Sequence, residues 1–158
     1  MMSDGRRTRR RWRWSNVPVP EPHVAGLLAG LVLHASKPQP LTEGRRFGRI
    51  RTAVGLASIV VGIATAAWAV RSAGNANLER PTALVTDGPY TYSRNPMYVA
   101  WTVLYAGVAL LSNAAWPLVL LPPVAVASHL GVRREERELE RAFGVEYREY
   151  RRDVPRYL

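Results

Sequence analysis

NPMYVAWTVLYAGVALLSNAAWPLVLLPPVAVASHLGV, residues 95–132, is a run of 38 residues that contains no Asp, Glu, Lys or Arg. As one continuous helix it would be about 57 Å long, nearly twice the ~30 Å hydrocarbon core of a bilayer. The sequence SNAAWP, Ser112–Pro117, supplies turn-forming residues near the middle of the run. The run therefore predicts two membrane helices, Met97–Leu111 and Ala115–Leu130, joined as a tight hairpin.

Two further apolar segments precede this hairpin. Ala53–Val70 is uncharged and rich in Gly and Ala, residues small enough to allow close approach between helices. His23–Ser36 is a shorter apolar segment, and the Pro and Gly residues of Lys37–Arg51 predict a loop between the two. We therefore expect an all-α integral membrane protein, with about four transmembrane helices in a transmembrane domain over residues 21–132.

The charged residues lie mainly outside these segments. The formal net charge is +10, and the N-terminal residues 1–20 form a basic arm rich in Arg and Trp, which suits an anionic membrane surface or a solvated tail. From Arg133 the chain changes to a charged helical pattern that Gly144 ends, so residues 133–158 predict a cytosolic C-terminal helix and tail. The net charge alone would suggest nucleic acid. The apolar segments instead indicate the lipid bilayer as partner, with no nucleic acid.

The distribution of arginine predicts the orientation. With four crossings, the N-terminal arm, the connection over residues 71–94 and the C-terminal tail share one side, and they hold most of the Arg residues. The positive-inside rule makes that side cytoplasmic, which predicts a multi-pass protein of the cell (inner) membrane with both termini and the active site in the cytoplasm. The basic residues of the loop over 37–51 oppose this orientation, unless the first segment only dips into the membrane.

The junction before the hairpin, DGPYTYSRNPMY (residues 87–98), has an unusual composition. Its Asp-Gly and Gly-Pro steps favour turns, and Asn95 before Pro96 is biased away from helix, whereas Pro96 suits a first helical turn. Irregular backbone at a membrane boundary is tolerated where it lines a polar cavity or a ligand. The alternative is an interfacial belt of tyrosines, in which Arg94 extends to lipid phosphate.

The charged helix after the hairpin has a second set of polar residues. If the last membrane helix continues past Val132, one face carries an imidazole, a guanidinium and two carboxylates: His129, Arg133, Glu136 and Glu140. Next to Arg94 and Asn95, such a face suits a zwitterionic ligand, because carboxylates would bind its ammonium and cations its carboxylate. The alternative is a solvated, salt-bridged helix. A metal site is not expected, since no second imidazole lies at ligand spacing.

Six motifs follow one another in the second half of the chain: GPY (88–90), RNPMY (94–98), EExxL (135–139), FG (143–144), the tyrosine pair 147 and 150, and VPR (154–156). With this order and the hairpin between them, the chain from Thr82 onward resembles the isoprenylcysteine carboxyl methyltransferase family. That family belongs with the phospholipid N-methyltransferases in a wider group of integral-membrane methyltransferases.

The resemblance implies transfer of a methyl group from S-adenosylmethionine at the membrane surface. It also implies that the start of the RNPMY helix and the Glu-Glu helix hold the cofactor, completed by the C-terminal tail. The cofactor-binding residues expected on this basis are Arg94, Asn95, Pro96, Tyr98, Glu135 and Glu136, together with Tyr90 of the GPY motif; we add His129 from its position on the same helix. Asn95 stands where the family often has His, so an imidazole is not essential there, and Ala100 replaces a common Gly.

The acceptor is expected to be lipidic or prenylated, with either a carboxylate or an amine as the methylated group. A carboxylate acceptor needs a cation to orient it, for which Arg94 or Arg156 is available, whereas an amine needs a proton acceptor such as Glu135 or Glu136. We therefore predict Arg94 and Glu135 as catalytic residues. Two alternatives are an NADPH-dependent membrane reductase of the sterol-reductase type, which a chain with only four crossings disfavours, and a non-enzymatic lipid-binding membrane protein.

Overall fold

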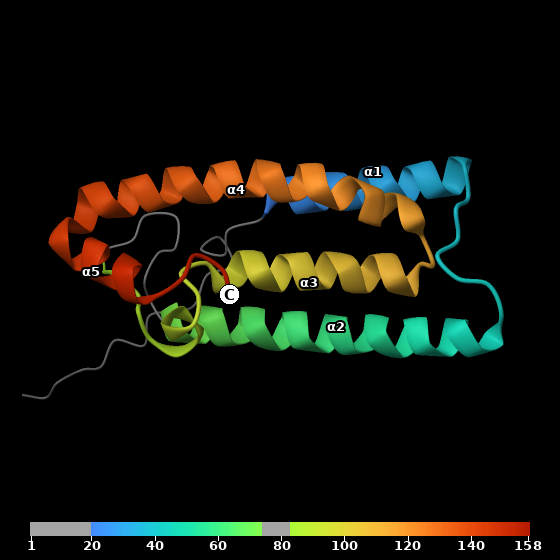
Figure 1. Cartoon of the computed structure of the whole chain (residues 1–158), viewed down its shortest axis with the longest axis horizontal. Helices are drawn as coiled ribbons and strands as arrows, with labels where there is room; N and C mark the ends of the chain where they lie inside the picture. Colours follow the sequence, from blue (N-terminus) through green and yellow to red (C-terminus); the bar gives the residue numbers. More distant parts are fainter. Residues whose placement is uncertain (1–19, 74–82) are drawn as a thin grey trace, which may run out of the picture.

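A computed structural model describes residues 20–73 and 83–158, and these two ranges are helical with no β-strand, which confirms the predicted all-α class (Figure 1). The basic arm predicted over residues 1–20 falls, except for Pro20, outside the described residues. In chain order the elements are α1 (Glu21–Ser36), α2 (Arg45–Ala73), the short 3-10 helix η2 (Gly88–Thr91), α3 (Pro96–Leu111), α4 (Ala115–Phe143) and α5 (Val145–Asp153).

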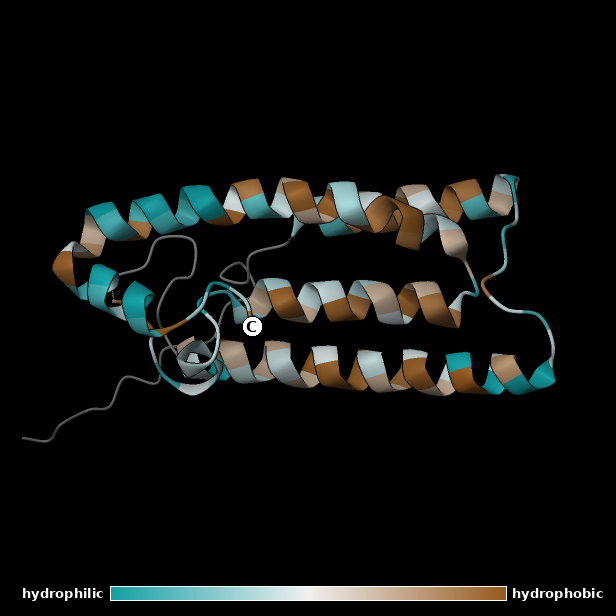
Figure 2. Ribbon diagram, in the orientation of Figure 1, coloured by the Kyte–Doolittle hydropathy of each residue, from teal (hydrophilic) through white to brown (hydrophobic). Residues whose placement is uncertain are grey.

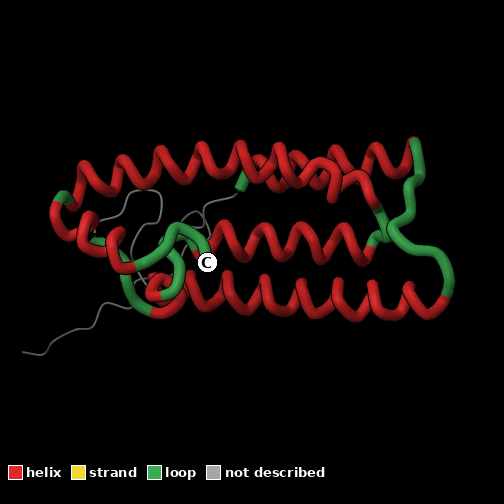
Figure 3. The backbone as a smooth tube through the Cα atoms, in the orientation of Figure 1, coloured by secondary structure: helices red, strands yellow, loops and turns green. Residues whose placement is uncertain are grey.

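The four long helices form an elongated bundle of two helix pairs (Figure 3). Helix α2 packs mainly on α3 and helix α1 mainly on α4, whereas the contact between α3 and α4 is much smaller. The C-terminal residues return to the start of α3, so the chain end lies against the same end of the bundle as α5 (Figure 1). The two pairs therefore meet along α3 and α4, and this boundary contains the candidate site.

Glycines allow the close approach within each pair. In the α2–α3 pair, a Cβ added to Gly55 would lie 3.2 Å from the carbonyl oxygen of Gly107. In the α1–α4 pair, a Cβ on Gly30 would lie only 2.6 and 2.7 Å from the backbone Cα and N of Pro117. The close approach predicted from the small residues of the second apolar segment is thus found between α2 and α3.

Asn113 joins the two loops at the end of the bundle away from the C-terminus. It lies in the turn between α3 and α4 with φ of 51°, and its Oδ1 accepts hydrogen bonds of 3.1 Å from the backbone N–H groups of both Leu41 and Thr42. The backbone N–H of Ala115 also donates to the carbonyl of Gln39, at 2.9 Å. These bonds fix the α1–α2 loop to the α3–α4 turn.

The prediction of a loop over Lys37–Arg51 is wrong for its last seven residues, because α2 already begins at Arg45. Gly44, with φ of +84°, makes the turn that precedes the helix, and Gly48 is accommodated within the first turns. The side chain of Arg51 donates hydrogen bonds to Thr42 Oγ1 and to the carbonyl of Leu110. This tertiary interaction is not predicted from the sequence.

Among the described residues, two helices, α2 and α4, are long and apolar enough to cross a membrane, and α3 is a shorter apolar helix. Large apolar side chains of these helices point outward, with Val60, Val119 and Val126 each 59–66% exposed. Hydrophilic residues gather at the two ends of the bundle, whereas its middle is mostly apolar (Figure 2). An exposed apolar surface of this extent is typical of contact with lipid rather than water.

Replacement of Gly30 by Ala tests the packing of α1 on α4. We expect a lower thermal unfolding temperature, equivalent to about 1–3 kcal/mol, because the new methyl group meets the backbone of Pro117, which has no freedom to move aside. Gly48→Ala is the control, since no atom lies within 4 Å of its added Cβ and Ala favours helix by about 1 kcal/mol. Circular dichroism in detergent would measure both, and equal stability of the two variants would contradict the packing described.

Candidate functional site

The segment from Gly88 to Asn95 is irregular and mostly buried. After η2, the chain reaches Pro96, the first residue of α3, without regular structure, as the sequence predicts. Gly88 has φ of +63°, and a Cβ there would overlap the Ser72 side chain of α2. Tyr90 is only 8% exposed and the Arg94 side chain is also 8% exposed. Such burial argues against the interfacial-belt alternative for these two residues.

Glu136 lies between two arginines beneath this segment. Its carboxylate accepts hydrogen bonds from Arg156 Nε (3.0 Å) and Nη2 (2.7 Å), and Arg94 Nη1 lies 3.1 Å from its Oε1. Burial by itself would raise the pKa of Glu136, but the hydrogen bonds from Arg156 and the charge of Arg94 outweigh it and hold that pKa below its usual range. The carboxylate is therefore ionised and forms a buried ionic cluster.

The C-terminal tail is fixed to the start of α3 by main-chain bonds as well. The backbone N–H of Arg94 donates to the carbonyl of Pro155 at 2.9 Å. The carbonyl of Arg156 accepts from Ser93 Oγ at 3.2 Å and from Asn95 Nδ2 at 3.1 Å. The structure thus brings together two of the segments that the sequence singles out, the RNPMY stretch and the VPR tail.

Glu135 has a different environment from its neighbour. Tyr98 donates a hydrogen bond of 2.7 Å to its Oε1, and the side chain reaches solvent. Glu135 lies on the part of α4 beyond the apolar segment. Its pKa is raised, mainly because its carboxyl group is partly desolvated and also because of the negative charges of Glu138 and Glu136. The hydrogen bond from Tyr98 acts in the opposite direction and lowers the pKa. The two adjacent carboxylates therefore differ in their contacts and in the direction of their pKa shifts, as their separation around the helix predicts.

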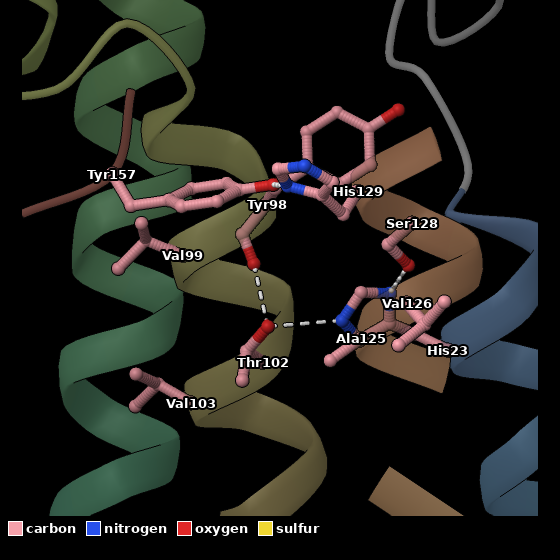
Figure 4. Close-up of a pocket in the computed structure, with 10 residues that line it drawn as sticks. All are labelled: His23, Tyr98, Val99, Thr102, Val103, Ala125, Val126, Ser128, His129 and Tyr157. Carbon is pink, nitrogen blue, oxygen red and sulfur yellow. Dashed lines mark hydrogen bonds between the residues drawn. The ribbon is translucent and has the colours of Figure 1, made fainter. Parts of the chain in front are cut away.

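A cavity of about 490 Å³ opens beside Tyr98, between α3 and α4 (Figure 4). Its walls are largely apolar, with Val99 and Val103 on α3 facing Ala125 and Val126 on α4. Tyr98, His129 and Tyr157 line one part of it, and His129 Nδ1 lies 3.1 Å from the Tyr157 hydroxyl. An apolar cavity next to a polar, charged group is the usual form of a site for a small amphiphilic ligand.

The predicted site residues separate into three groups. The buried ionic cluster contains Arg94, Asn95 and Glu136. The cavity and its edge contain Tyr98, Glu135 and His129. The side chains of Tyr90 and Pro96 are buried in packing, Tyr90 against Ala69 and Met97. Arg133, expected on the same face as His129 and Glu136, is exposed instead.

Several residues of the site were missed or undervalued by sequence reasoning. Arg156 is part of the buried cluster, and Tyr147 is fully buried, with its hydroxyl 3.4 Å from Arg94 Nη1. The paired tyrosines and the VPR motif could have pointed to both. No sequence pattern indicates His23, a lone histidine in an apolar segment, which also lines the cavity.

Comparison with protein families places the chain in a known class of membrane enzymes. The model of the phospholipid methyltransferase family matches residues 50–146, which is more than half of the chain. The chain belongs to this family of membrane methyltransferases that act on lipids, in agreement with the resemblance found in the motifs. No curated protein and no solved structure matches the chain. Helix α1 and the VPR tail lie outside the matched residues.

Substitution of Glu136 by Gln tests the buried cluster. We expect a loss of about 3–5 kcal/mol of stability, because the 8%-exposed Arg94 side chain keeps its charge without a counter-ion. Glu140→Gln is the matched control, because Glu140 pairs with Arg151 in an exposed ion pair worth about 0–1 kcal/mol. Unfolding followed by circular dichroism would compare the two, and a small effect at both positions would mean that Glu136 is not the anchor of this cluster.

The lowered pKa of Glu136 predicts a specific dependence of stability on pH. Its contribution is complete above the pKa of an unfolded Glu, about 4.3, and is lost as the pH falls through the lower folded value. The wild-type protein should therefore lose stability on acidification below about pH 4, and Glu136→Gln should lack this part of the loss. Thermal melts at a series of acidic pH values measure it, and parallel curves for the two proteins would count against the predicted shift.

Proposed function

We propose that the protein transfers a methyl group from S-adenosylmethionine to a lipidic or prenylated acceptor at the membrane surface. One observation carries this proposal: within the family's matched region, Tyr98 and His129 line an apolar cavity between two helices, and Glu135 is hydrogen-bonded to Tyr98 at its edge. The buried cluster of Arg94, Asn95 and Glu136 lies at the same end of these two helices. A polar edge suits a charged cofactor and an apolar interior suits a hydrophobic acceptor.

In the membrane, we place α1 to α4 as four crossings, with both termini and the site at the cytoplasmic face of the inner membrane. Helices α2 and α4 have 29 residues each and extend about 43 Å, which leaves charged ends outside a ~30 Å core. Helices α1 and α3 have 16 residues, about 24 Å, so their ends lie near the two interfaces. This places residues 133–158 in the cytosol, where the tail completes the cofactor site.

The residues present fit the amino-acid part of S-adenosylmethionine. Arg94 Nε is buried and finds no acceptor among the described residues, so it suits a ligand carboxylate. The amide N–H groups of Asn95 donate to the carbonyl of Arg156 and to Glu136, so Asn95 holds the tail and the surroundings of Arg94 in place. Glu135 suits the ligand ammonium, with Tyr98 and His129 next to it. Glu136 holds Arg94 in place, and Tyr90 and Pro96 support the segment from behind.

When bound, S-adenosylmethionine would supply its sulfonium methyl group to a nucleophilic oxygen or nitrogen of the acceptor, and its sulfur would leave as a neutral thioether. The chain itself contributes position and proton transfer. Glu135, whose pKa is raised, can take the proton that an amine acceptor releases, whereas Arg94 orients a carboxylate. The valines of the cavity hold the acceptor chain and exclude water. The family match favours methyl transfer over the reductase and the lipid-binding alternatives.

Titration calorimetry of the detergent-purified protein with S-adenosylmethionine tests this proposal. We expect saturable binding that Glu135→Gln weakens about tenfold or more, because the variant removes a charge-assisted hydrogen bond to the ligand. Glu149→Gln, which removes an exposed carboxylate of α5, serves as the control and should bind normally. Binding of NADPH alone, or no binding of either ligand, would overturn the proposed activity.

A further inference from the structure

His23 is a histidine of α1, outside the residues that match the family, yet it belongs to the cavity. It is only 3% exposed and links three helices (Figure 4). Its Nε2 lies 3.0 Å from Thr102 Oγ1 on α3, and its Nδ1 lies 3.2 Å from Ser128 Oγ on α4. Both hydroxyl residues also line the cavity, so the three form a polar group within apolar walls.

The hydrogen bond made by Thr102 determines which nitrogen of His23 carries a proton. Thr102 donates its only hydroxyl proton to the backbone carbonyl of Tyr98, at 2.9 Å. Toward His23 it therefore acts as an acceptor, so the imidazole must carry a proton on Nε2. Along the described parts of the chain no carboxylate pairs with His23, and burial without a counter-ion favours the neutral ring.

A neutral ring with a proton on Nε2 has a bare Nδ1, which accepts the hydroxyl proton of Ser128. Ser128 Oγ then has lone pairs left and no proton to donate. Thr102 Oγ1 likewise has no proton to donate to a ligand and can only accept a hydrogen bond. In this part of the cavity, the hydroxyls of Ser128 and Thr102 can therefore accept a hydrogen bond from a ligand but cannot donate one.

We propose that His23 is a specificity-determining residue of the cavity, which fixes the Ser128 hydroxyl as an acceptor and so favours ligands whose polar group carries an N–H or O–H donor. A carboxylate would meet only lone pairs at Ser128 and Thr102, which disfavours it. This inference rests on the proposed function in one respect, that the cavity holds the methyl acceptor. The cavity would then select among methyl acceptors by their capacity to donate a hydrogen bond to Ser128.

Four eight-carbon amphiphiles test the selectivity: octylamine, octanol, octanoate and trimethyloctylammonium. The last carries a positive charge without an N–H donor and so separates charge from hydrogen bonding. We expect octylamine to bind about tenfold more tightly than either trimethyloctylammonium or octanoate, and octanol more tightly than octanoate, as one hydrogen bond predicts. Calorimetry on the full chain in zwitterionic nanodiscs measures this, with empty nanodiscs correcting for partition into lipid.

Variants assign the selectivity to the histidine. Ser128→Ala should bring the four affinities together. His23→Leu should do the same, whereas His23→Gln, which retains one donor and one acceptor, should keep part of the preference. Equal affinities for octylamine and trimethyloctylammonium in the wild-type protein, or tighter binding of octanoate, would overturn the proposal. Circular dichroism checks that each variant is folded.

Nitrogen-15 NMR of histidine-labelled protein tests the protonation state without any ligand, with the His23 signal assigned by its loss in His23→Gln. The neutral ring protonated on Nε2 supports the inference, and an imidazolium or a ring protonated on Nδ1 contradicts it. None of these measurements contains S-adenosylmethionine. Failure to bind that cofactor would therefore overturn the proposed activity and leave the selectivity result standing.

Discussion

The carboxylate of Glu136, buried between Arg94 and Arg156, is the interaction on which the site end of the molecule depends. It joins three segments that are remote in the sequence: the start of α3, the C-terminal end of α4 and the C-terminal tail. A buried charge is costly unless its partners are complete, so these segments adopt their arrangement together or not at all. The backbone bonds between the tail and Ser93–Asn95 follow from this arrangement.

The neighbouring carboxylate shows the opposite balance. Glu136 is satisfied by its own chain and has a lowered pKa, whereas Glu135 lies at the surface of α4, has one hydrogen bond from Tyr98 and has a raised pKa. Charged groups that are incompletely satisfied in the folded protein are characteristic of functional sites, since a ligand supplies what is missing. Two identical residues, adjacent in sequence, thus differ in role: Glu136 holds the structure, and Glu135 is the one we propose for ligand binding.

Much of the fold could be predicted from the sequence because its signals are local. The long uncharged run, the turn residues at Ser112–Pro117 and the proline at position 96 predict α3 and the start of α4 closely, although α4 continues beyond the predicted end at Leu130 to Phe143. The early start of α2 was missed because Gly44 and Gly48 favour a loop locally, and the contact that Arg51 makes in this part of the helix is to a residue 59 positions away. Within the site, motif order pointed to Arg94 and Glu135, but only tertiary structure reveals His23, whose partners lie 79 and 105 residues away.

The bonds of Asn113 at the opposite end of the bundle have a consequence for the cavity. The helix pairs α1–α4 and α2–α3 are tied there through the loops, and at the site end the tail and the ionic cluster join α4 to α3. Between these two ends of the bundle α3 and α4 make few contacts, and the cavity lies in this part of the molecule. The distance between α3 and α4 across the cavity therefore depends on contacts at three levels: Asn113 at one end, the cluster of Glu136 at the other, and His23, which bridges the two helices between them. A change in the turn at Asn113 would act on the cavity from the far end of the bundle, without altering a residue that lines it.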